Sequence, residues 1–357
     1  MKIILSGGGT LGPVTPLLAI RETIQKQYPD AQFLWVGTKR GPERELLQEL
    51  GIEFTTLASG KFRRYLSLWN VIDIARIFIG FFQSLRLLLQ ENPDVCISAG
   101  GFISVPLHWA AWFLGIPTWI HQQDIQIGLA NRLMAPFARV VTTSLQKNLS
   151  AFSKKKAIWL GNPVRADIMK GNIIEAQKLF NLTKDKPVVF ATGGGTGSLR
   201  VNQMIVEAMP HLKDFVQMIH LSGKERPQEL VGRAANLYSD YHTYQFFTDE
   251  MKHAYAIADI IISRGGFGTL TEIAALGKIA IIIPKPGHQV ENLRFLEQQG
   301  AAIFVNEKIA DGLYLAKIVR QLLENEIQQK QLAYNLNKLL PRAKEEDILN
   351  VLARVIA

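Results

Sequence analysis

Two glycine-rich segments, one in each half of the chain, have the composition of phosphate-binding turns. Residues 7–12 read GGGTLG and residues 193–197 read GGGTG, and each stands between a short apolar run and a helical pattern. Glycine lets the backbone approach a ligand closely, and the first turn of a helix offers unpaired N–H groups and a partial positive charge. Neither segment matches the dinucleotide-binding fingerprint or has the lysine of a P-loop. One copy alone could be a plain strand-to-helix turn, but two copies favour a pair of loops that face one cleft.

A third glycine turn stands in residues 263–272, which read SRGGFGTLTE. We expect the N-terminus of the following helix to meet a diphosphate, and Glu272 to accept both hydroxyls of a ribose. The alternative places Glu272 in the first helical turn, where the helix dipole favours an acidic residue. Gln289 and Asn292, in a segment after the next strand-like run, could reach a sugar from the same sheet edge, because ligands of open α/β sheets bind at the carboxyl ends of strands.

Three more polar residues stand near expected strand ends. Arg165, in the sequence GNPVR, could grip a phosphate with two parallel hydrogen bonds, or form a surface ion pair. Asp124 could project into the cleft, or cap a helix expected over residues 127–134. His121 is expected to be buried in the core or behind a residue that contacts substrate.

Short apolar runs alternate with amphipathic patterns along the whole chain. This alternation predicts parallel sheets with helices on both faces. We expect an N-terminal domain over residues 1–161, on which a helix at 345–357 packs back, and a C-terminal domain over residues 162–344. Strands are expected near 2–6, 33–37, 54–58, 95–99, 118–122 and 140–144, and in the second half near 157–161, 187–192, 217–223, 244–247, 260–265 and 279–284.

Composition narrows the classes of partner. The 357 residues have a formal net charge of +9, which indicates an anionic partner: nucleic acid, an acidic membrane surface or a phosphorylated ligand. The single cysteine, Cys96, cannot form an internal disulfide and is expected in a buried strand of a protein from a reducing compartment. Residues 95–123 contain no Asp, Glu, Lys or Arg. Glycines and prolines divide this stretch, so we expect a buried α/β segment there and no membrane span.

Residues 61–90 combine an apolar surface wider than one core contact needs with flanking cations. The cations are Lys61, Arg63, Arg64, Arg76 and Arg86. An apolar face ringed by positive charge suits docking on an anionic bilayer. A deeply buried core helix is the alternative.

Together with the segments HQQDIQIGLAN (121–131) and HQVEN (288–292), these motifs resemble those of glycosyltransferase family 28 over essentially the whole chain. The resemblance implies a GT-B fold, two Rossmann-like parallel-sheet domains facing across a cleft. It also implies an inverting hexosyltransferase of peptidoglycan synthesis, which moves N-acetylglucosamine from its UDP donor to the 4-hydroxyl of undecaprenyl-diphospho-N-acetylmuramoyl-pentapeptide (lipid I). Such an enzyme would lie peripherally on the cytoplasmic face of the cell membrane and need no cofactor, metal ion or nucleic acid.

The resemblance assigns substrate contacts residue by residue. Thr10, Leu11 and Gly12 would line the cleft near the transferred sugar, with Asp124 at the family's asparagine position for the same sugar. Arg165 would reach the nucleotide phosphates, and Gly195 would lie beside the diphosphate. The backbone of Thr248 would meet uracil, and Gln289 would hold the donor sugar. The remaining contacts, to diphosphate and ribose, would come from Phe267, Gly268, Thr269, Leu270, Thr271 and Glu272.

The chain departs from the family pattern at the residues of acid–base chemistry. Pro13 stands where the family has a histidine that is a proposed general base, and proline cannot take up a proton. The family's glutamate is Gln122, its asparagine is Asp124, and the serine of its second loop is Gly195. Our hypothesis is that Asp124 acts as the general base, because an inverting displacement needs a group that removes the acceptor's hydroxyl proton.

Other functions remain open at this point. A diacylglycerol glycosyltransferase would use the same donor and the same membrane surface. A catalytically impaired nucleotide-sugar-binding protein that serves as a membrane scaffold is compatible with Pro13. Nucleic-acid binding is compatible with the charge, but the chain has no RNA- or DNA-binding motif.

Overall fold

The computed structural model describes residues 1–39, 41, 43–60 and 68–357. Two compact units divide the chain: unit 1 comprises Met1–Arg165 and Arg342–Ala357, and unit 2 comprises Ala166–Pro341. The boundary expected after residue 161 lies within unit 1. An isolated parallel bridge between Asn162 and Arg342 joins the outgoing and returning chain there.

Within the described residues, unit 1 has a seven-stranded sheet in the order β3-β2-β1-β4-β5-β6-β7. All of its strands pair in parallel. They are β1 (Lys2–Ser6), β2 (Gln32–Gly37), β3 (Glu53–Thr56), β4 (Val95–Ser98), β5 (Thr118–Gln122), β6 (Val140–Thr143) and β7 (Ala157–Trp159). The run at 157–161, which we grouped with the strands of the second half, instead extends the first sheet, because β7 pairs with β6.

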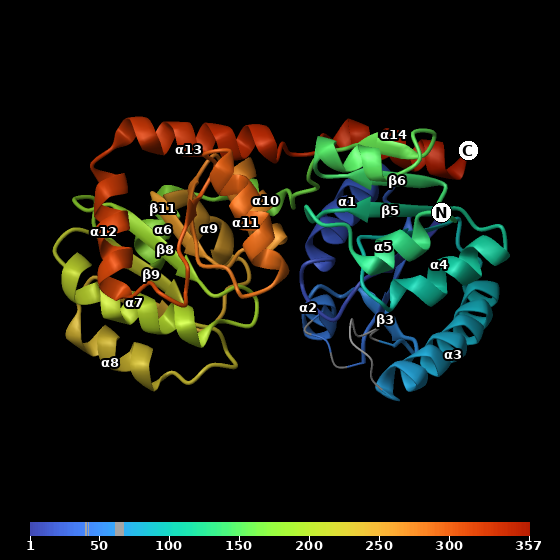
Figure 1. The fold of residues 1–357 in the computed structure, drawn as a ribbon, viewed down its shortest axis with the longest axis horizontal. Coiled ribbons are helices and arrows are strands. Elements are labelled where there is room, and N and C mark those ends of the chain that lie inside the picture. Colours follow the sequence, from blue (N-terminus) through green and yellow to red (C-terminus); the bar gives the residue numbers. More distant parts are fainter. Residues whose placement is uncertain (40, 42, 61–67) are drawn as a thin grey trace. The chain divides into compact units, whose positions relative to one another are not determined.

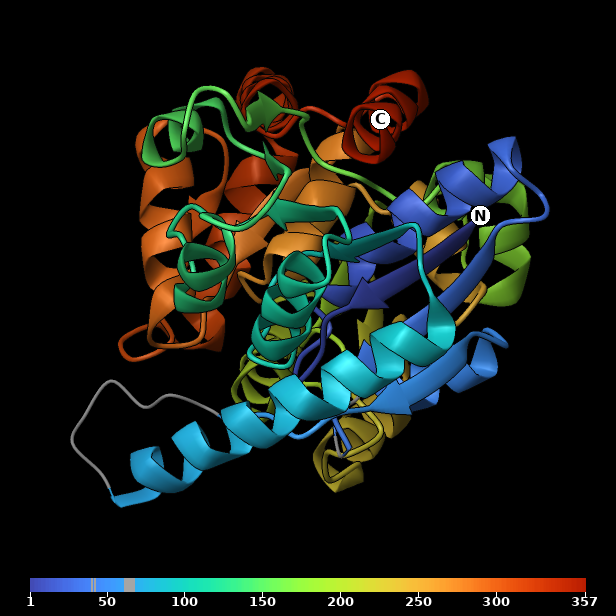
Figure 2. The ribbon, with the colours of Figure 1, turned by 90° about the vertical axis from the view of Figure 1, so that its right-hand side faces the viewer.

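Helices cover both faces of the first sheet (Figures 1 and 2). They are α1 (Val14–Gln27), α2 (Glu43–Glu49), α3 (Leu68–Glu91), α4 (Ser104–Phe113), α5 (Leu129–Met134), a 3-10 helix η1 (Gln146–Ala151) and α14 (Glu345–Ile356). Successive side chains of β1 point to opposite faces, as its period requires. Leu5 packs with α1 and α14, whereas Ile4 packs with α4 and the C-terminal part of α3. Figure 2 shows α3 in light blue along its face of the sheet.

The C-terminal helix belongs to unit 1. Ile348, Val351, Leu352 and Val355 recur at helical spacing on α14 and are buried against α1. The Lys26 ammonium on α1 lies 2.7 Å from the Glu345 carboxylate at the start of α14. Figure 1 shows this dark red helix beside α1 and β6.

The described residues of unit 2 form a six-stranded parallel sheet in the order β10-β9-β8-β11-β12-β13. Its strands are β8 (Val188–Thr192), β9 (Gln217–Leu221), β10 (Tyr241–Tyr244), β11 (Ile260–Ser263), β12 (Ile279–Ile282) and β13 (Ile303–Phe304). The order repeats that of β3-β2-β1-β4-β5-β6, so β8 is equivalent to β1 and β9 to β2. The pair of Rossmann-like parallel-sheet domains expected from the sequence is therefore confirmed.

The helices of unit 2 are η2 (Asp167–Lys170), α6 (Ile173–Leu179), α7 (Leu199–Leu212), α8 (Glu229–Leu237), α9 (Glu250–Ile257), α10 (Phe267–Ala275), α11 (His288–Gln298), α12 (Gly312–Leu323) and α13 (Glu326–Leu339). One face of the sheet packs on α7 and α12. The other face carries an aromatic cluster of Phe180, Phe190, Phe247 and Tyr255.

The strand expected at 244–247 is wrong in its position. β10 ends at Tyr244, where the expected strand begins. The aromatic residues beyond it have strand-like composition, but Phe247 packs its ring 5.3 Å from that of Phe180 in the aromatic cluster. Packing against the sheet thus outweighed the local preference for extended pairing.

Cys96 is fully buried in β4, and burial raises the pKa of its thiol. Over the described part of the chain, no helix combines the length and the apolar character that crossing a membrane requires.

Candidate active site

The first glycine loop joins β1 to α1 at the carboxyl end of the first sheet. Gly9 adopts φ +84°, a conformation that favours glycine. The Leu11 carbonyl accepts hydrogen bonds from Val14 and Thr15 and so closes the turn into the helix. Pro13 occupies the N-cap position with φ −68°, which suits the start of a helix. The predicted residues Thr10, Leu11 and Gly12 therefore lie at the carboxyl end of β1.

A buried carboxylate that sequence analysis missed holds this loop. Glu43, the first residue of α2, is 0% exposed. Its Oε2 accepts a hydrogen bond of 3.1 Å from the Gly9 amide, and its Oε1 accepts bonds of 2.8 Å and 2.5 Å from the amide and hydroxyl of Thr38. A Cβ on Gly8 would stand 2.2 Å from Glu43 Oε1, so a larger residue there would displace the carboxylate from its present position.

The second glycine loop follows β8, the equivalent of β1. Gly194 and Gly197 have φ of +80° and +70°. A Cβ on Gly197 would stand 2.4 Å from the Ser222 carbonyl oxygen, and a Cβ on Gly193 would stand 2.3 Å from the Ser198 nitrogen. Ser198 then caps α7 through its hydroxyl, which accepts from the Val201 amide. The predicted contact Gly195 is exposed at the tip of this loop.

The third glycine turn leads from β11 into α10. Gly266 is the N-cap residue, and the helix begins at Phe267. Glu272 therefore lies in the second turn, and the explanation of Glu272 as a dipole-favoured first-turn residue is wrong. Its side chain is 7% exposed, and its Oε2 accepts a 3.0 Å hydrogen bond from the hydroxyl of Tyr255 on α9. Sequence analysis missed Tyr255, because nothing local connects it to Glu272.

Arg264 links the loops at the carboxyl edge of the second sheet. Its Nε and Nη2 donate to the Ser198 hydroxyl, from Nε at 3.0 Å, and its Nη1 donates to the Ile283 carbonyl at 3.0 Å and to the Glu307 carboxylate. One cation thus ties the second glycine loop to the ends of β11 and β12. The sequence alone indicated no separate role for Arg264 within the segment 263–272.

Two more predicted donor contacts lie at the same edge. The Gln289 side chain, on α11, accepts a 2.9 Å hydrogen bond from the Lys285 amide. The Thr248 amide, beyond β10, donates to Glu250 Oε2 at 2.9 Å. The backbone group expected to meet uracil therefore already has a carboxylate partner in this structure. Asn292, three residues after Gln289 on α11, is buried.

Asp124 lies just beyond the carboxyl end of β5 in unit 1 and is half-buried. Its carbonyl oxygen accepts hydrogen bonds from the Gln122 side chain at 2.8 Å and from the Asn148 side chain at 2.9 Å, so its backbone is fixed. The alternative role as a helix cap is wrong, because α5 begins at Leu129 with Gly128 as its N-cap residue.

The two histidines that the sequence places in unit 1 are both buried. His121 Nδ1 lies 3.0 Å from Thr142 Oγ1 and its Nε2 lies 3.0 Å from Ser144 Oγ. Burial lowers the pKa of His121 to about 3, and it does the same to His108. Both rings are therefore neutral near pH 7 and face the interior, which agrees with the expected core position of His121.

The predicted residues thus form two groups. Thr10, Leu11, Gly12 and Asp124 follow β1 and β5 in unit 1, whereas Gly195, Thr248, residues 267–272 and Gln289 follow strands of the second sheet. Arg165, the last residue of unit 1's first segment, is half-buried. Within the described ranges, no cluster of His, Cys, Asp or Glu side chains could hold a metal ion.

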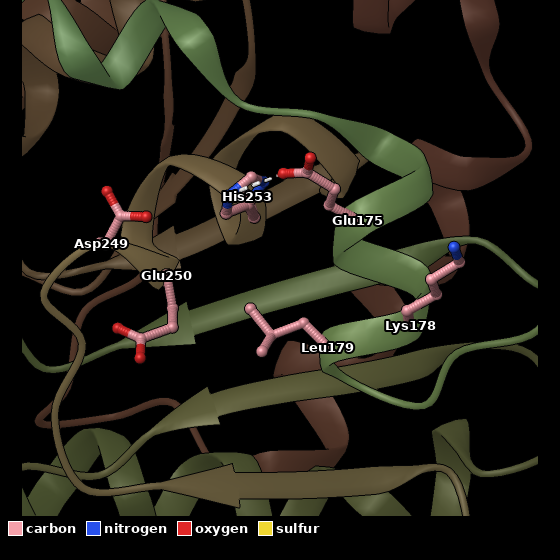
Figure 3. A pocket seen from close by; sticks show the side chains of 6 residues that line it. All are labelled: Glu175, Lys178, Leu179, Asp249, Glu250 and His253. Atoms are coloured by element: carbon pink, nitrogen blue, oxygen red, sulfur yellow. Dashed lines mark ion pairs between the residues drawn. The ribbon is translucent and has the colours of Figure 1, made fainter.

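A pocket on unit 2 lies apart from nearly all of these residues. It is lined by Glu175, Lys178 and Leu179 of α6, by Glu250 and His253 of α9, and by Asp249 (Figure 3). His253 Nε2 lies 3.3 Å from Glu175 Oε2, as the dashed line in Figure 3 marks. None of the predicted site residues lines it, although Asp249 and Glu250 directly follow Thr248 in the chain and Glu250 accepts from the Thr248 amide.

Comparison with known proteins agrees with this division. Residues 3–143 match the glycosyltransferase family 28 N-terminal domain and residues 188–347 match the family 28 C-terminal domain. A UDP-N-acetylglucosamine–N-acetylmuramyl-(pentapeptide) pyrophosphoryl-undecaprenol N-acetylglucosamine transferase of Lachnoclostridium phytofermentans is 35% identical, with 91% of each chain covered. A relative of the same name from Shouchella clausii is 35% identical, covering 92% of this chain and 90% of its own. The crystal structure of Acinetobacter baumannii MurG superposes with a TM-score of 0.72 at 25% identity, covering 99% of this chain and 98% of its own.

Proposed function

Because the chain belongs to glycosyltransferase family 28, we propose that it transfers N-acetylglucosamine from UDP-N-acetylglucosamine to the 4-hydroxyl of the muramoyl sugar of lipid I, forming lipid II. The observation that carries this proposal is the match to relatives of that named activity over nine-tenths of both chains. The product is the lipid-linked disaccharide from which peptidoglycan is built, so the reaction serves cell wall biogenesis, cell shape and division.

Unit 2 supplies most of the donor contacts in this proposal, and Arg165 of unit 1 supplies one more. The N-terminus of α10 and the loop at Gly195 meet the diphosphate, because unpaired helix N–H groups and glycine backbone suit an anion. Glu272 accepts the ribose hydroxyls, and the bond from Tyr255 orients its carboxylate. Gln289 contacts the donor sugar and Arg165 contacts the nucleotide phosphates. Uracil accepts the hydrogen bond of the Thr248 amide, which in this structure is donated to the Glu250 carboxylate.

Unit 1 supplies the general base. The acceptor's 4-hydroxyl oxygen forms a bond to C1 of N-acetylglucosamine as the bond from C1 to the UDP oxygen breaks, which inverts the configuration at C1. The hydroxyl proton passes to the Asp124 carboxylate, and the charge that develops on UDP is stabilised at the N-terminus of α10. Burial of His121 and His108 and the absence of a proton site on Pro13 favour this assignment.

Unit 1 also carries a surface suited to a membrane. An apolar patch runs over α3, α4 and the turn after α5, and we define it by its exposed members Phe78, Ile79, Phe82, Trp112, Phe113 and Phe137. The Phe81 and Phe113 ring centroids are 6.3 Å apart, and those of Trp112 and Phe137 are 4.7 Å apart, so the three elements form one surface.

Cations accompany the apolar patch. Of the predicted cations, Arg76 and Arg86 on α3 are exposed, and Arg76 lies 3.3 Å from the Asp73 carboxylate. Lys61, Arg63 and Arg64 lie outside the described residues, and Arg132 on α5 is a further exposed cation. The C-terminal part of α3 packs into the core through Leu88, so the helix is partly buried and partly exposed. The patch docks the protein peripherally on the anionic cytoplasmic face of the membrane, where a lipid-linked acceptor is found.

An acceptor assay tests the function. Purified protein is given radiolabelled UDP-N-acetylglucosamine with lipid I or with diacylglycerol, in detergent and in vesicles. Label in lipid II supports the proposal. Label only in diacylglycerol would establish the other acceptor, and UDP binding without any transfer would leave a nucleotide-sugar-binding scaffold.

A further inference from the structure

The carboxylate of Glu43 takes the place of a bound anion at the first glycine loop. A backbone amide in such a loop is the group that a phosphate oxygen would use. The Gly9 amide instead donates to Glu43, and both carboxylate oxygens have protein donors. A second anion at Gly9 would have to displace a fully buried carboxylate and would be repelled by its charge.

Near the second glycine loop, the residue that follows the proline before the next helix is neutral, and the acidic first residue of that helix, Glu229, is exposed and pairs with Arg233. Gln228 is the N-cap residue of α8 as Glu43 is the first residue of α2, and each follows a proline in the sequence. Gln228 Oε1 accepts from the Ser222 hydroxyl at 2.8 Å, and its Nε2 donates to the carbonyls of Gly223 and Arg226 at 2.9 Å and 2.6 Å. It stabilises the neighbouring turn without placing a negative charge at the second loop.

A cation also bonds to the second loop. Arg226 Nε donates to the Thr196 carbonyl at 3.1 Å, and Arg264 bonds Ser198 at the loop's end. The two loops therefore have the same glycine pattern, but a carboxylate bonds the first, whereas two arginines bond the second, one of them ion-paired with Glu307.

We propose that Glu43 is a positioning residue that fixes the first glycine loop through the Gly9 amide, so that this loop orders the reaction centre while the donor diphosphate binds the second loop. This inference rests on the proposed transferase function. It assigns Gly8 and Gly41 a specific reason to be glycine, because a Cβ at either would stand 2.2 Å or less from a Glu43 oxygen.

The test is Glu43→Gln, with Glu45→Gln, an exposed residue of the same helix, as its matched control. A glutamine keeps the shape, but only one of its two terminal atoms can accept. If the oxygen stays with Thr38, the amide nitrogen faces the Gly9 N–H, and donor meets donor. We expect kcat to fall roughly ten- to a hundred-fold, because small misplacements near a reaction centre have effects of that size, with UDP affinity unchanged. Glu45→Gln should have the kcat and the UDP affinity of the wild type.

Hydrogen exchange gives a readout independent of turnover. In Glu43→Gln the amides of residues 7–12 should exchange faster, while those of β1 and α1 keep their protection. The reciprocal change, Gln228→Glu, sets a carboxylate oxygen against the Gly223 and Arg226 carbonyls and should lower UDP affinity at least severalfold.

Each outcome decides the inference. The inference would be overturned if Glu43→Gln were fully active, or if its UDP affinity fell by the same factor as its kcat. Unchanged hydrogen exchange at residues 7–12 would also overturn it. Global unfolding of Glu43→Gln would make Glu43 a purely structural residue and also overturn it. If the wild type transferred no sugar at all, the proposed function would fail, and the exchange and UDP-binding measurements would still decide the role of Glu43.

Discussion

The carboxyl edges of the two sheets are built from equivalent strands but are stabilised by groups of opposite charge. In unit 1 the glycine loop after β1 is tied to its neighbour by the buried carboxylate of Glu43. In unit 2 the loop after β8 is tied to its neighbours by Arg264, which bonds Ser198 and the Ile283 carbonyl. A cation beside a glycine loop favours a phosphate ligand there and a carboxylate disfavours one.

A backbone motif that occurs in both units therefore need not have the same role in each. The strand, the glycine turn and the helix are the same in both units, because each solves the same packing problem. The group that holds the turn comes from elsewhere in the chain and sets the local charge. In our proposal unit 1 therefore serves the acceptor, the base and the membrane, whereas unit 2 serves the nucleotide.

The largest expected effect is in unit 1. Asp124→Asn keeps the size of the side chain but removes the proposed proton acceptor, so transfer should fall by about a hundredfold to ten-thousandfold. UDP affinity, a property of unit 2, should stay within error of the wild type in calorimetry. Undiminished turnover with normal donor binding would clear Asp124 of the role of base.

The next effect separates the surfaces of the two units. Phe82→Ser with Phe113→Ser removes two exposed rings of the apolar patch, at 66% and 67% exposure. Losing their insertion should cost about 3 kcal/mol, or roughly a hundredfold in partition to vesicles that contain anionic lipid. Leu237→Ser, an exposed residue of α8 in unit 2, is the control and should bind like the wild type. Equal losses in both variants would argue against a specific docking surface.

Acid should affect unit 1 more than unit 2. Burial lowers the pKa of His108 and His121 to about 3, and in unit 2 it does so for His220 and also lowers the pKa of His242, to a smaller extent. Below pH 6.5 the unfolded chain binds protons that the folded rings of lowest pKa reject, so the folded state loses about 1.4 kcal/mol per histidine and pH unit until the folded pKa is reached. This stability is fully present above pH 6.5.

Tryptophan fluorescence can follow unit 1 alone, because all six tryptophans lie within residues 1–165. Between pH 7 and pH 5 the urea midpoint by fluorescence should fall more than the midpoint by circular dichroism. His121→Asn should reduce the pH dependence of the urea midpoint measured by fluorescence by the contribution of one histidine. A pH dependence that is the same in the variant would mean that other groups cause the acid sensitivity.

The smallest effect concerns the nucleotide side. Tyr255→Phe removes the hydroxyl that bonds Glu272, which should weaken UDP binding by about 1 kcal/mol, or roughly fivefold. The preference for UDP over 2′-deoxy-UDP should shrink at the same time, and kcat should not change. Tyr334→Phe, at an exposed site on α13, is the control. An unchanged ribose preference would show that Tyr255 does not orient Glu272.

Much of the fold follows from local patterns. The apolar runs of β1, β4, β8 and β11 and the glycines that follow all four lie next to one another in the chain, so strand and turn can be predicted together. The errors arose where distant packing decided. Phe247 joined an aromatic cluster instead of a strand, and the run at 157–161 paired with β6. The alternative explanation of Glu272 as a first-turn residue was wrong for a local reason, because α10 begins directly after the N-cap residue Gly266.

By itself, the sequence determined the repeated strand–glycine–helix units, the likeness to family 28 and the proline at position 13 after the first glycine loop, since each is written in neighbouring residues. Only the tertiary structure decided what holds each loop. Glu43 stands 34 residues from Gly9, and Tyr255 stands 17 residues from Glu272. Such pairs meet only after the sheet has brought its strand ends together, because a buried charge needs donors that no single segment can supply.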